Sequence, residues 1–324
     1  MKAVMCKGYG PPESLVIEDL PDPGPGAGEV LVDVTYVGLN FFDTLIIRNK
    51  YQIKPELPFS PASEFSGRVA ALGAGVSGFR VGDRVCGSLG HGAARSKVVV
   101  KPNQIYAIPE GLSDERAAGL IITYGTSHHA LKQRAKLRPG ETLAVLGASG
   151  GVGIAAVELG ALMGARVIAC ASSQDKIDFA MRHGAVEGID YSKSDLKDEL
   201  RRLTGGKGVD VVYDPVGGDF AEQALRAMAW MGRFLIIGFA AGPIPKLPLN
   251  IPLLKSLDVL GVYWGAWTQA EPAAHRENMA ELLGWARDGK LKASIHAVLP
   301  LDQAAEGINM LARREAQGKV LLKV

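Results

Sequence analysis

Seven consecutive residues, Gly147-Ala148-Ser149-Gly150-Gly151-Val152-Gly153, have the composition of a phosphate-binding turn. They follow an apolar, strand-like run at 142–146 and precede an almost wholly apolar, helix-like run at 154–163. Glycines here permit a tight turn and a close approach of a pyrophosphate, which the free N–H groups and positive dipole end of the helix would bind. The pattern therefore predicts a dinucleotide site, with contacts from Ala148, Ser149, Gly150, Gly151 and Val152.

The end of the next expected strand indicates which dinucleotide is bound. An acidic residue about 20 residues past the glycines would accept hydrogen bonds from the ribose of NAD. This chain instead has Ser172 and Ser173, followed by Asp175 and Lys176. The hydroxyl groups can solvate a 2′-phosphate and the ammonium can neutralise it. Asp175 falls in a first helical turn, where Asp is favoured anyway. The residues favour NADPH, held by Ser172, Ser173 and Lys176; a solvated surface role is the alternative for Lys176.

From residue 124 onward, apolar runs alternate with segments of helical period. Alternation at this spacing predicts right-handed βαβ units and a doubly wound, six-stranded parallel sheet, so the fold class is α/β. The expected strands are 142–146, 166–171, 187–190, 209–213, 233–237 and 258–262. The expected helices between them are 152–163, 175–183, 196–204 and 220–231.

The N-terminal part of the chain has a different pattern. Short β-branched runs between Gly- and Pro-rich turns predict an irregular, mostly antiparallel β domain. Its expected strands include 30–37, 67–72, 81–86 and 97–100. After the parallel sheet we expect helices at 273–289 and 301–315 and a short strand at 319–323. We expect this tail to pack back on the first domain, which gives segments 1–122, 123–264 and 265–324 and a ligand cleft between domains.

Composition and charge exclude several classes of function. The chain has 324 residues, 47% of them apolar, which is enough for two packed cores. Its net charge is +2 and it has no run of Lys or Arg, so the sequence predicts no basic surface for binding nucleic acid. No stretch has the length of a membrane span, and the N-terminus lacks a secretory pattern. Three separated cysteines indicate neither a disulfide framework nor a zinc knuckle, so we expect a cytoplasmic protein.

Several spaced motifs occur in the order expected of one superfamily. They are the segments 38–44, 81–85, 125–126, 147–153, 214–218, 238–239, 261–265 and 318–320. On these residues the chain resembles, essentially end to end, the medium-chain dehydrogenase/reductase superfamily, and more narrowly its zinc-independent NADPH:quinone oxidoreductase branch. The resemblance implies a GroES-like β domain plus a Rossmann domain, and a homodimer joined through the edges of the two Rossmann sheets.

The resemblance also indicates where zinc ligands would stand. Asn40 occupies the position of a ligand cysteine in zinc-dependent relatives, and Ser63 that of a ligand histidine. Amide and hydroxyl oxygens are poor zinc ligands beside thiolate and imidazole. The four-cysteine lobe that should follow Val85 is missing, with Cys86 alone there. We therefore expect no zinc.

Without a metal to polarise a carbonyl, the hydride acceptor must be electrophilic already, as a quinone is, or the protein must stabilise the anion that forms. The family motif implies Asn40, Asp43, Tyr51 and Thr126 around the reacting nicotinamide. Asn40 would anchor the nicotinamide ribose or the acceptor oxygen. Asp43 would orient a neighbour, and Tyr51 is the expected proton donor. A turn-forming asparagine after a strand is the alternative for Asn40, and a surface loop tyrosine is the alternative for Tyr51.

The same resemblance implies further contacts. Tyr191 would close over the 2′-phosphate, Gly238 and Phe239 would line the cofactor, and Arg314 would reach its phosphates; a structural tyrosine and a solvated arginine are the alternatives. Tyr263 and Trp264 follow the sixth strand, at the carboxyl edge where ligands bind. They would wall a flat acceptor pocket by stacking or lie in a dimer interface.

Two other functions are compatible with these residues. Enones and enoyl thioesters also accept hydride, at the β-carbon, so an NADPH-dependent enone or enoyl-thioester reductase is the first alternative. The second is an NADPH-binding protein with little catalysis. In each case the partner is a small molecule, with no nucleic acid and no membrane.

Overall fold

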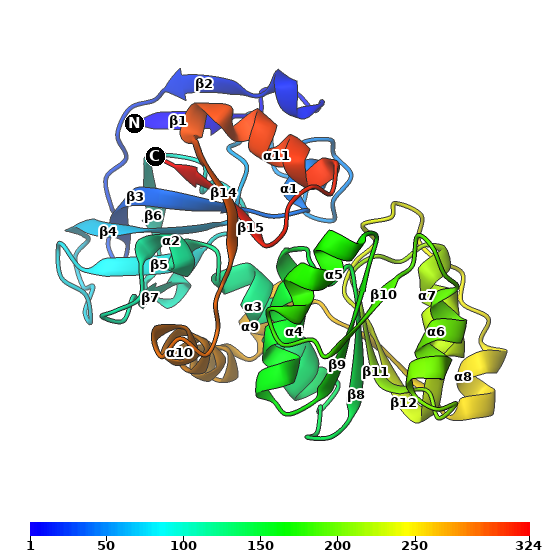
Figure 1. The fold of residues 1–324 in the computed structure, drawn as a ribbon. Coiled ribbons are helices and arrows are strands. Elements are labelled where there is room, and N and C mark those ends of the chain that lie inside the picture. Colours follow the sequence, from blue (N-terminus) through cyan, green and yellow to red (C-terminus); the bar gives the residue numbers. More distant parts are fainter. The chain divides into compact units, whose positions relative to one another are not determined.

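The computed structural model describes residues 1–324, which form two compact units (Figure 1). The first consists of Met1–Ile122, Leu283–Asp288 and Ala293–Val324. The second consists of Thr123–Leu282 and Gly289–Lys292. Nowhere does the chain form a helix with the length and apolarity that a membrane crossing needs.

The first unit is built on a seven-stranded sheet in the order β14-β15-β3-β4-β5-β7, with β6 also paired to β3. Each pair of neighbouring strands in this sheet is antiparallel, except the pair β14 and β15, which is parallel. Strands β1 and β2 form a separate antiparallel pair. The strands are β1 (Lys2–Met5), β2 (Val16–Asp19), β3 (Val30–Leu39), β4 (Glu64–Leu72), β5 (Arg84–Ser88), β6 (Lys97–Val100), β7 (Ile105–Ala107), β14 (Ile295–Pro300) and β15 (Lys319–Lys323). Its helices are α1 (Asp43–Ile46), α2 (Asp114–Ala118) and α11 (Ala304–Ala312), with 3₁₀ turns at Pro12–Ser14, Pro102–Gln104 and Leu301–Gln303.

The second unit contains the predicted six-stranded parallel sheet, in the order β10-β9-β8-β11-β12-β13. The confirmed order is that of a doubly wound sheet, because the chain moves outward from β8 first to one side and then to the other. The strands are β8 (Thr142–Leu146), β9 (Arg166–Ala171), β10 (Glu187–Asp190), β11 (Val209–Asp214), β12 (Met228–Ile236) and β13 (Asp258–Gly261).

Helices cover both faces of this sheet, with α4 and α5 on one side and α6, α7 and α8 on the other (Figure 1). The central strand β8 is buried along its whole length, as expected of a strand covered on two faces. The helices of this part of the chain are α3 (Ile121–His129), a π-helical turn at Ala130–Arg134, α4 (Gly151–Leu162), α5 (Gln174–Met181), α6 (Leu196–Leu203), α7 (Asp219–Arg226), α8 (Asn250–Lys255), α9 (Trp264–Ala270) and α10 (Pro272–Arg287).

One predicted helix is too long. The pattern predicts a helix over 220–231, but α7 ends at Arg226 and β12 begins at Met228. Met228 pairs with Val209 of β11, and its side chain is buried in the core of the sheet. The run from Met228 to Met231 is apolar at every position, so its period does not distinguish helix from strand, and pairing with a neighbouring strand decides.

Two other boundaries differ for conformational reasons. The expected helix over 301–315 is a 3₁₀ turn followed by α11, which ends at Ala312; Arg314 has a φ of +58°, which is incompatible with continuing the helix. The expected strand at 81–86 begins only at Arg84, because Gly82 has a φ of +93° and Val81 is exposed in the turn.

Candidate functional site

The glycine-rich turn joins β8 to α4 through positions that require glycine. Gly147, directly after β8, has a φ of +58°, in the left-handed region. A Cβ added at Gly153 would lie 2.1 Å from the carbonyl oxygen of Gly147, so the first turn of α4 packs directly on the end of the strand. The backbone N–H of Ala148 donates to the carbonyl of Cys170 at 3.2 Å, which ties the turn to β9.

The first turn of α4 has the properties of an anion site. Gly151, Val152 and Gly153 open the helix, and their amide groups have no acceptor within it. Gly150 precedes them in extended conformation, and Ser149 is buried beside it. The predicted pyrophosphate contacts therefore lie at the positive end of a helix dipole.

The loop after β11 is held by its own aspartate. The Asp214 carboxylate accepts hydrogen bonds from the backbone N–H of Val216 at 2.8 Å and of Gly217 at 2.9 Å. Burial raises the pKa of Asp214 to about 6, although these two hydrogen bonds act to lower it. The loop is thereby fixed at the carboxyl end of the strand.

This loop lies against the glycine turn on one side and the end of β12 on the other. A Cβ at Gly147 would lie 3.0 Å from the Val216 side chain, and one at Gly217 would lie 3.0 Å from Phe239. A Cβ at Gly238 would lie 3.5 Å from the same loop. The carboxyl ends of three parallel strands therefore meet at one edge, which is where ligands bind in such sheets.

The end of β9 carries a hydroxyl and an ammonium in contact. Lys176 Nζ donates to Ser172 Oγ at 3.1 Å. Ser173 is the N-cap residue of α5, and Tyr191, after β10, donates its backbone N–H to the carbonyl of Ala171 at 3.1 Å. The structure thus brings these four predicted cofactor contacts to the ends of two neighbouring strands.

A buried ion pair lies beside Asn40 in the first unit. Lys319 Nζ donates to Glu64 Oε1 at 2.6 Å, to Asn40 Oδ1 at 2.8 Å and to the Leu39 carbonyl at 2.7 Å. Asn40 Nδ2 donates to the same Glu64 oxygen at 2.8 Å and lies 3.5 Å from the Gly38 carbonyl. Glu64 is 0% exposed and Lys319 3% exposed. Both polar ends of the Asn40 side chain are therefore bound within the protein.

Asp43 is fully buried and binds the backbone of two segments. Its Oδ2 accepts from the N–H of Asn40 at 2.8 Å, and its Oδ1 from the N–H of Ala62 at 3.1 Å. Burial raises the pKa of Asp43 from 3.8 to about 7, outweighing the two hydrogen bonds and the charge of Lys319, which lower it. Asp43 therefore orients the loop that carries Asn40.

Three other predicted site residues have accessible surface. Tyr51 is partly exposed and stacks on Phe42, with ring centroids 5.2 Å apart and planes at 21°. Thr126, in α3, is partly exposed, whereas the residues on either side of it are buried. Arg314 is exposed and ends α11 in left-handed conformation.

The two predicted pocket aromatics have different environments. Trp264 opens α9, and its ring would lie 2.8 Å from a Cβ at Gly125, the residue before Thr126. The same ring meets His275 edge-on, with centroids 5.3 Å apart. Tyr263 is 52% exposed. Trp264 therefore packs on α3, while Tyr263 faces solvent.

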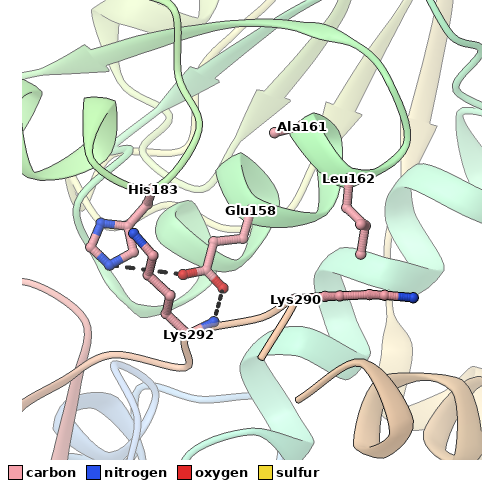
Figure 2. A pocket seen from close by; sticks show the side chains of 6 residues that line it. All are labelled: Glu158, Ala161, Leu162, His183, Lys290 and Lys292. Atoms are coloured by element: carbon pink, nitrogen blue, oxygen red, sulfur yellow. Dashed lines mark hydrogen bonds and ion pairs between the residues drawn. The ribbon is translucent and has the colours of Figure 1, made fainter. Parts of the chain in front are cut away.

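A small cavity of about 180 Å³ lies beside the second half of α4 (Figure 2). It is lined by Glu158, Ala161, Leu162, His183, Lys290 and Lys292. The buried Glu158 carboxylate accepts from the N–H of Lys292 and the hydroxyl of Tyr124, both at 2.9 Å. None of the predicted site residues lines this cavity.

Sequence reasoning missed Glu64 and Lys319, although Lys319 lies in a segment used for the resemblance and Glu64 directly follows Ser63. One signal was available, since Lys319 opens the short strand 319–323 and is followed there by three apolar residues, 320–322. A lysine in such a strand is rarely buried unless it is paired. The pattern does not identify the partner, because the two residues are 255 positions apart.

Comparisons with known proteins agree with this geometry. Family models match residues 26–110, as an alcohol dehydrogenase GroES-like domain, and 151–283, as a zinc-binding dehydrogenase. The quinone oxidoreductase-like protein 2 homolog of Nematostella vectensis is 41% identical, covering 99% of this chain and 88% of that protein. The quinone oxidoreductase of Pseudomonas aeruginosa is 35% identical over 99% of both chains.

A solved structure extends the likeness to three dimensions. The crystal structure of Escherichia coli quinone oxidoreductase complexed with NADPH matches with a TM-score of 0.93 at 29% identity, over 100% of both chains. The chain therefore belongs to the medium-chain dehydrogenase/reductase superfamily, as an oxidoreductase of the quinone oxidoreductase type, and the resemblance drawn from its motifs is confirmed.

Gly153→Ala should destabilise the protein, because the new methyl group would overlap the Gly147 carbonyl. We expect the free energy of unfolding in urea to fall by about 1–3 kcal/mol, as for overpacked cores. Gly284→Ala is the matched control: its Cβ would meet nothing within 4 Å in α10, and it should gain ~0.5–1 kcal/mol. Equal effects of the two changes would contradict the close packing of the turn.

Asp43 should make stability depend on pH. Its pKa is raised on folding, from 3.8 to about 7, so its stabilising contribution is full below pH 3.8 and is lost as the pH rises through about 7. The advantage of wild type over Asp43→Asn should therefore shrink between about pH 4 and about pH 7, by at most about 1.4 kcal/mol per pH unit, and stay constant at higher pH. Urea titrations of both proteins measure it, and a constant difference would be incompatible with the raised pKa.

Proposed function

We propose that the protein transfers a hydride from NADPH to a quinone, without zinc. The observation that carries this proposal is the end of β9, where Lys176 and Ser172 are in contact at 3.1 Å and no carboxylate occupies that position. An ammonium stabilises a 2′-phosphate by charge and hydrogen bonding, and NAD lacks that phosphate. The NADPH in the Escherichia coli structure and the name of the Pseudomonas aeruginosa relative support the assignment.

The proposed NADPH contacts follow from the elements already described. NADPH supplies the hydride when bound, and the chain binds and orients it. The residues proposed to hold it are Asn40, Thr126, Ala148, Ser149, Gly150, Gly151, Val152, Ser172, Ser173, Lys176, Tyr191, Gly238, Phe239 and Arg314.

The hydrogen bonds of Asn40 favour one of its two expected roles. Its Nδ2 group faces Glu64 at 2.8 Å and Gly38 at 3.5 Å, and one lone pair of its Oδ1 accepts from Lys319. The capacity left over is the second lone pair of Oδ1, which requires a donor on the ligand. A ribose hydroxyl of the nicotinamide half is such a donor, and the oxygen of a quinone is not.

The residues around Asn40 do not fit a zinc ion, although one matching family model is described as a zinc-binding dehydrogenase. The ammonium of Lys319 lies 2.8 Å from Asn40 Oδ1, and its charge would oppose a divalent cation. Ser63 Oγ donates to the Gly90 carbonyl at 2.9 Å. Amide and hydroxyl groups are also poor zinc ligands. We therefore propose a reaction that uses no metal.

An acceptor reduced without a metal must itself be electrophilic. A quinone that takes up a hydride and then a proton becomes a hydroquinone, and its anion is stable enough to take that proton from water or from a side chain. We propose Tyr51 as the donor, with its ring held against Phe42. Tyr263 and Trp264 remain proposed walls of the acceptor pocket, and Asp43 acts through the Asn40 loop.

We also propose a homodimer formed through the outer edge of β13. This strand pairs only with β12 and ends one side of the six-stranded sheet. Unpaired edge strands are templates for pairing with another chain, and exposed apolar patches mark interfaces. The apolar residues of this region that are more than one third exposed are Trp230, Met231, Ile244, Leu249, Leu253, Leu254, Val259 and Tyr263.

A panel of NADPH-oxidation assays tests the function. Benzoquinone and naphthoquinone should be reduced with NADPH and poorly with NADH, and Lys176→Ala should lower the NADPH preference roughly tenfold. Lys207→Ala, which removes an exposed lysine paired with Asp210, is the matched control and should change nothing. Comparable rates with NADH would overturn the cofactor assignment. Turnover of enones or enoyl-CoA alone would replace the quinone with the alternative acceptor, and binding without any turnover would remove the enzymatic function.

Sedimentation equilibrium tests the dimer. Val259→Asp places a charge on the proposed interface strand and should shift the protein to the monomer. Val298→Asp introduces the same charge at a valine that is 40% exposed on β14, the edge strand of the other sheet, and should leave the mass unchanged. A monomeric wild type, or a Val259→Asp dimer, would contradict the proposed interface.

A further inference from the structure

Lys319 is a buried ammonium whose hydrogen bonds are all used. Its three N–H groups are matched by three acceptors: Glu64 Oε1 at 2.6 Å, the Leu39 carbonyl at 2.7 Å and Asn40 Oδ1 at 2.8 Å. Lysine has three donors and no acceptor, so this site satisfies it completely. Two of the three acceptors belong to consecutive residues, 39 and 40, so the ammonium binds the last residue of β3 and the residue that follows it.

Glu64 connects the same segment to a helix. Its Oε1 accepts from Lys319 and from Asn40 Nδ2, while its Oε2 accepts from the backbone N–H of Ile122 at 2.9 Å. Ile122 lies in the first turn of α3, where N–H groups lack helical partners and a negative charge is stabilised. Thr126 follows on the same helix, one turn later.

Sheet register and two glycines create the space for this pair. In the sheet, Gly38 of β3 lies opposite Glu64 of β4. A Cβ at Gly38 would lie 2.7 Å from the Glu64 side chain, and one at Gly119 would lie 3.0 Å from the Lys319 side chain. The ion pair thus occupies volume that side chains at these two positions would fill.

The pair permits one orientation of the Asn40 amide. With Oδ1 toward Lys319 and Nδ2 toward Glu64, both contacts are charge-assisted hydrogen bonds. Rotation of the amide by half a turn would set its N–H groups against the ammonium and its oxygen against the carboxylate. The second lone pair of Oδ1 is therefore held in a fixed direction.

We propose that Lys319 and Glu64 are positioning residues for cofactor binding, which fix the Asn40 oxygen to accept a hydroxyl of the nicotinamide ribose. This inference rests on the proposed NADPH-dependent function. It adds two residues to those that the family motif implies around the nicotinamide, which are Asn40, Asp43, Tyr51 and Thr126. Neither residue touches the ligand, and both act through Asn40. Their loss should weaken recognition of the nicotinamide half of NADPH and spare the adenosine half.

Binding measurements on the full chain test the proposal with two probes. NADPH contains the nicotinamide ribose, whereas 2′,5′-ADP contains only the adenosine half. By titration calorimetry, Lys319→Met should raise the Kd for NADPH about tenfold, as for one lost hydrogen bond, and leave the Kd for 2′,5′-ADP unchanged. Glu64→Gln, which keeps the shape of the side chain, should weaken NADPH binding in the same selective way.

A double-mutant cycle separates positioning from general damage. If Lys319 acts through Asn40, then Lys319→Met should add nothing to the effect of Asn40→Ala on the Kd for NADPH. Arg84→Met is the matched control, because it removes a partly buried cation that binds Asp114 and the Leu112 carbonyl in the same unit. It should leave both Kd values unchanged. Circular dichroism checks that each variant is folded. If Lys319→Met does not fold, the same measurements are made with Glu64→Gln.

The outcomes distinguish failure of the positioning role from failure of the proposed function. A wild type that binds neither NADPH nor 2′,5′-ADP overturns the proposed function itself. If the wild type binds both probes, the positioning role alone is overturned by any of three results. Lys319→Met weakens the binding of both probes equally, it weakens the binding of neither, or its effect on the Kd for NADPH adds to that of Asn40→Ala.

Discussion

Burying a carboxylate is costly unless the protein replaces the interactions that water would supply. For Glu64, which has no exposed surface, the replacements are the side chains of Lys319 and Asn40 and the backbone N–H of Ile122. Together with Glu64, these residues come from four separate parts of the chain. The same contacts join the Asn40 side chain, the start of β15 and the start of α3 at one point. Asp43, in the same region, receives only backbone hydrogen bonds at its oxygens, and burial raises its pKa to about 7.

The second unit relies on close backbone packing rather than on buried charged side chains. In its glycine turn the backbone forms the proposed binding surface, because glycines at 147 and 153 bring the strand end and the helix start into direct contact. Three strand ends meet at that edge, and Asp214 fixes one of the loops through two amide hydrogen bonds. In the proposed function, side chains at this edge contribute mainly discrimination between NADPH and NADH, as at Ser172 and Lys176. In the first unit, by contrast, the buried side chains of Glu64, Lys319 and Asp43 hold the surrounding backbone in place.

The difference explains how much of the molecule could be predicted from its sequence. The parallel strands were predictable, since each is a short apolar run bounded by turn residues, and three of them begin and end at the predicted residues. The start of β12 was not, because its apolar run has no distinguishing period. The glycine turn was predictable because its chemistry is local. The pairing of Glu64 with Lys319 was not, because it depends on β3 lying between β4 and β15.

The two glycines beside the ion pair depend on it to different degrees. A methyl group at Gly38 would lie 2.6 Å from the Ala118 carbonyl as well as against the Glu64 side chain. Gly38 is therefore constrained by two independent neighbours, and only Gly119 depends mainly on the ion pair, through the Lys319 side chain. Loss of the charges at 64 and 319 would remove the closest neighbour of position 119, whereas position 38 would still require glycine because of the Ala118 carbonyl.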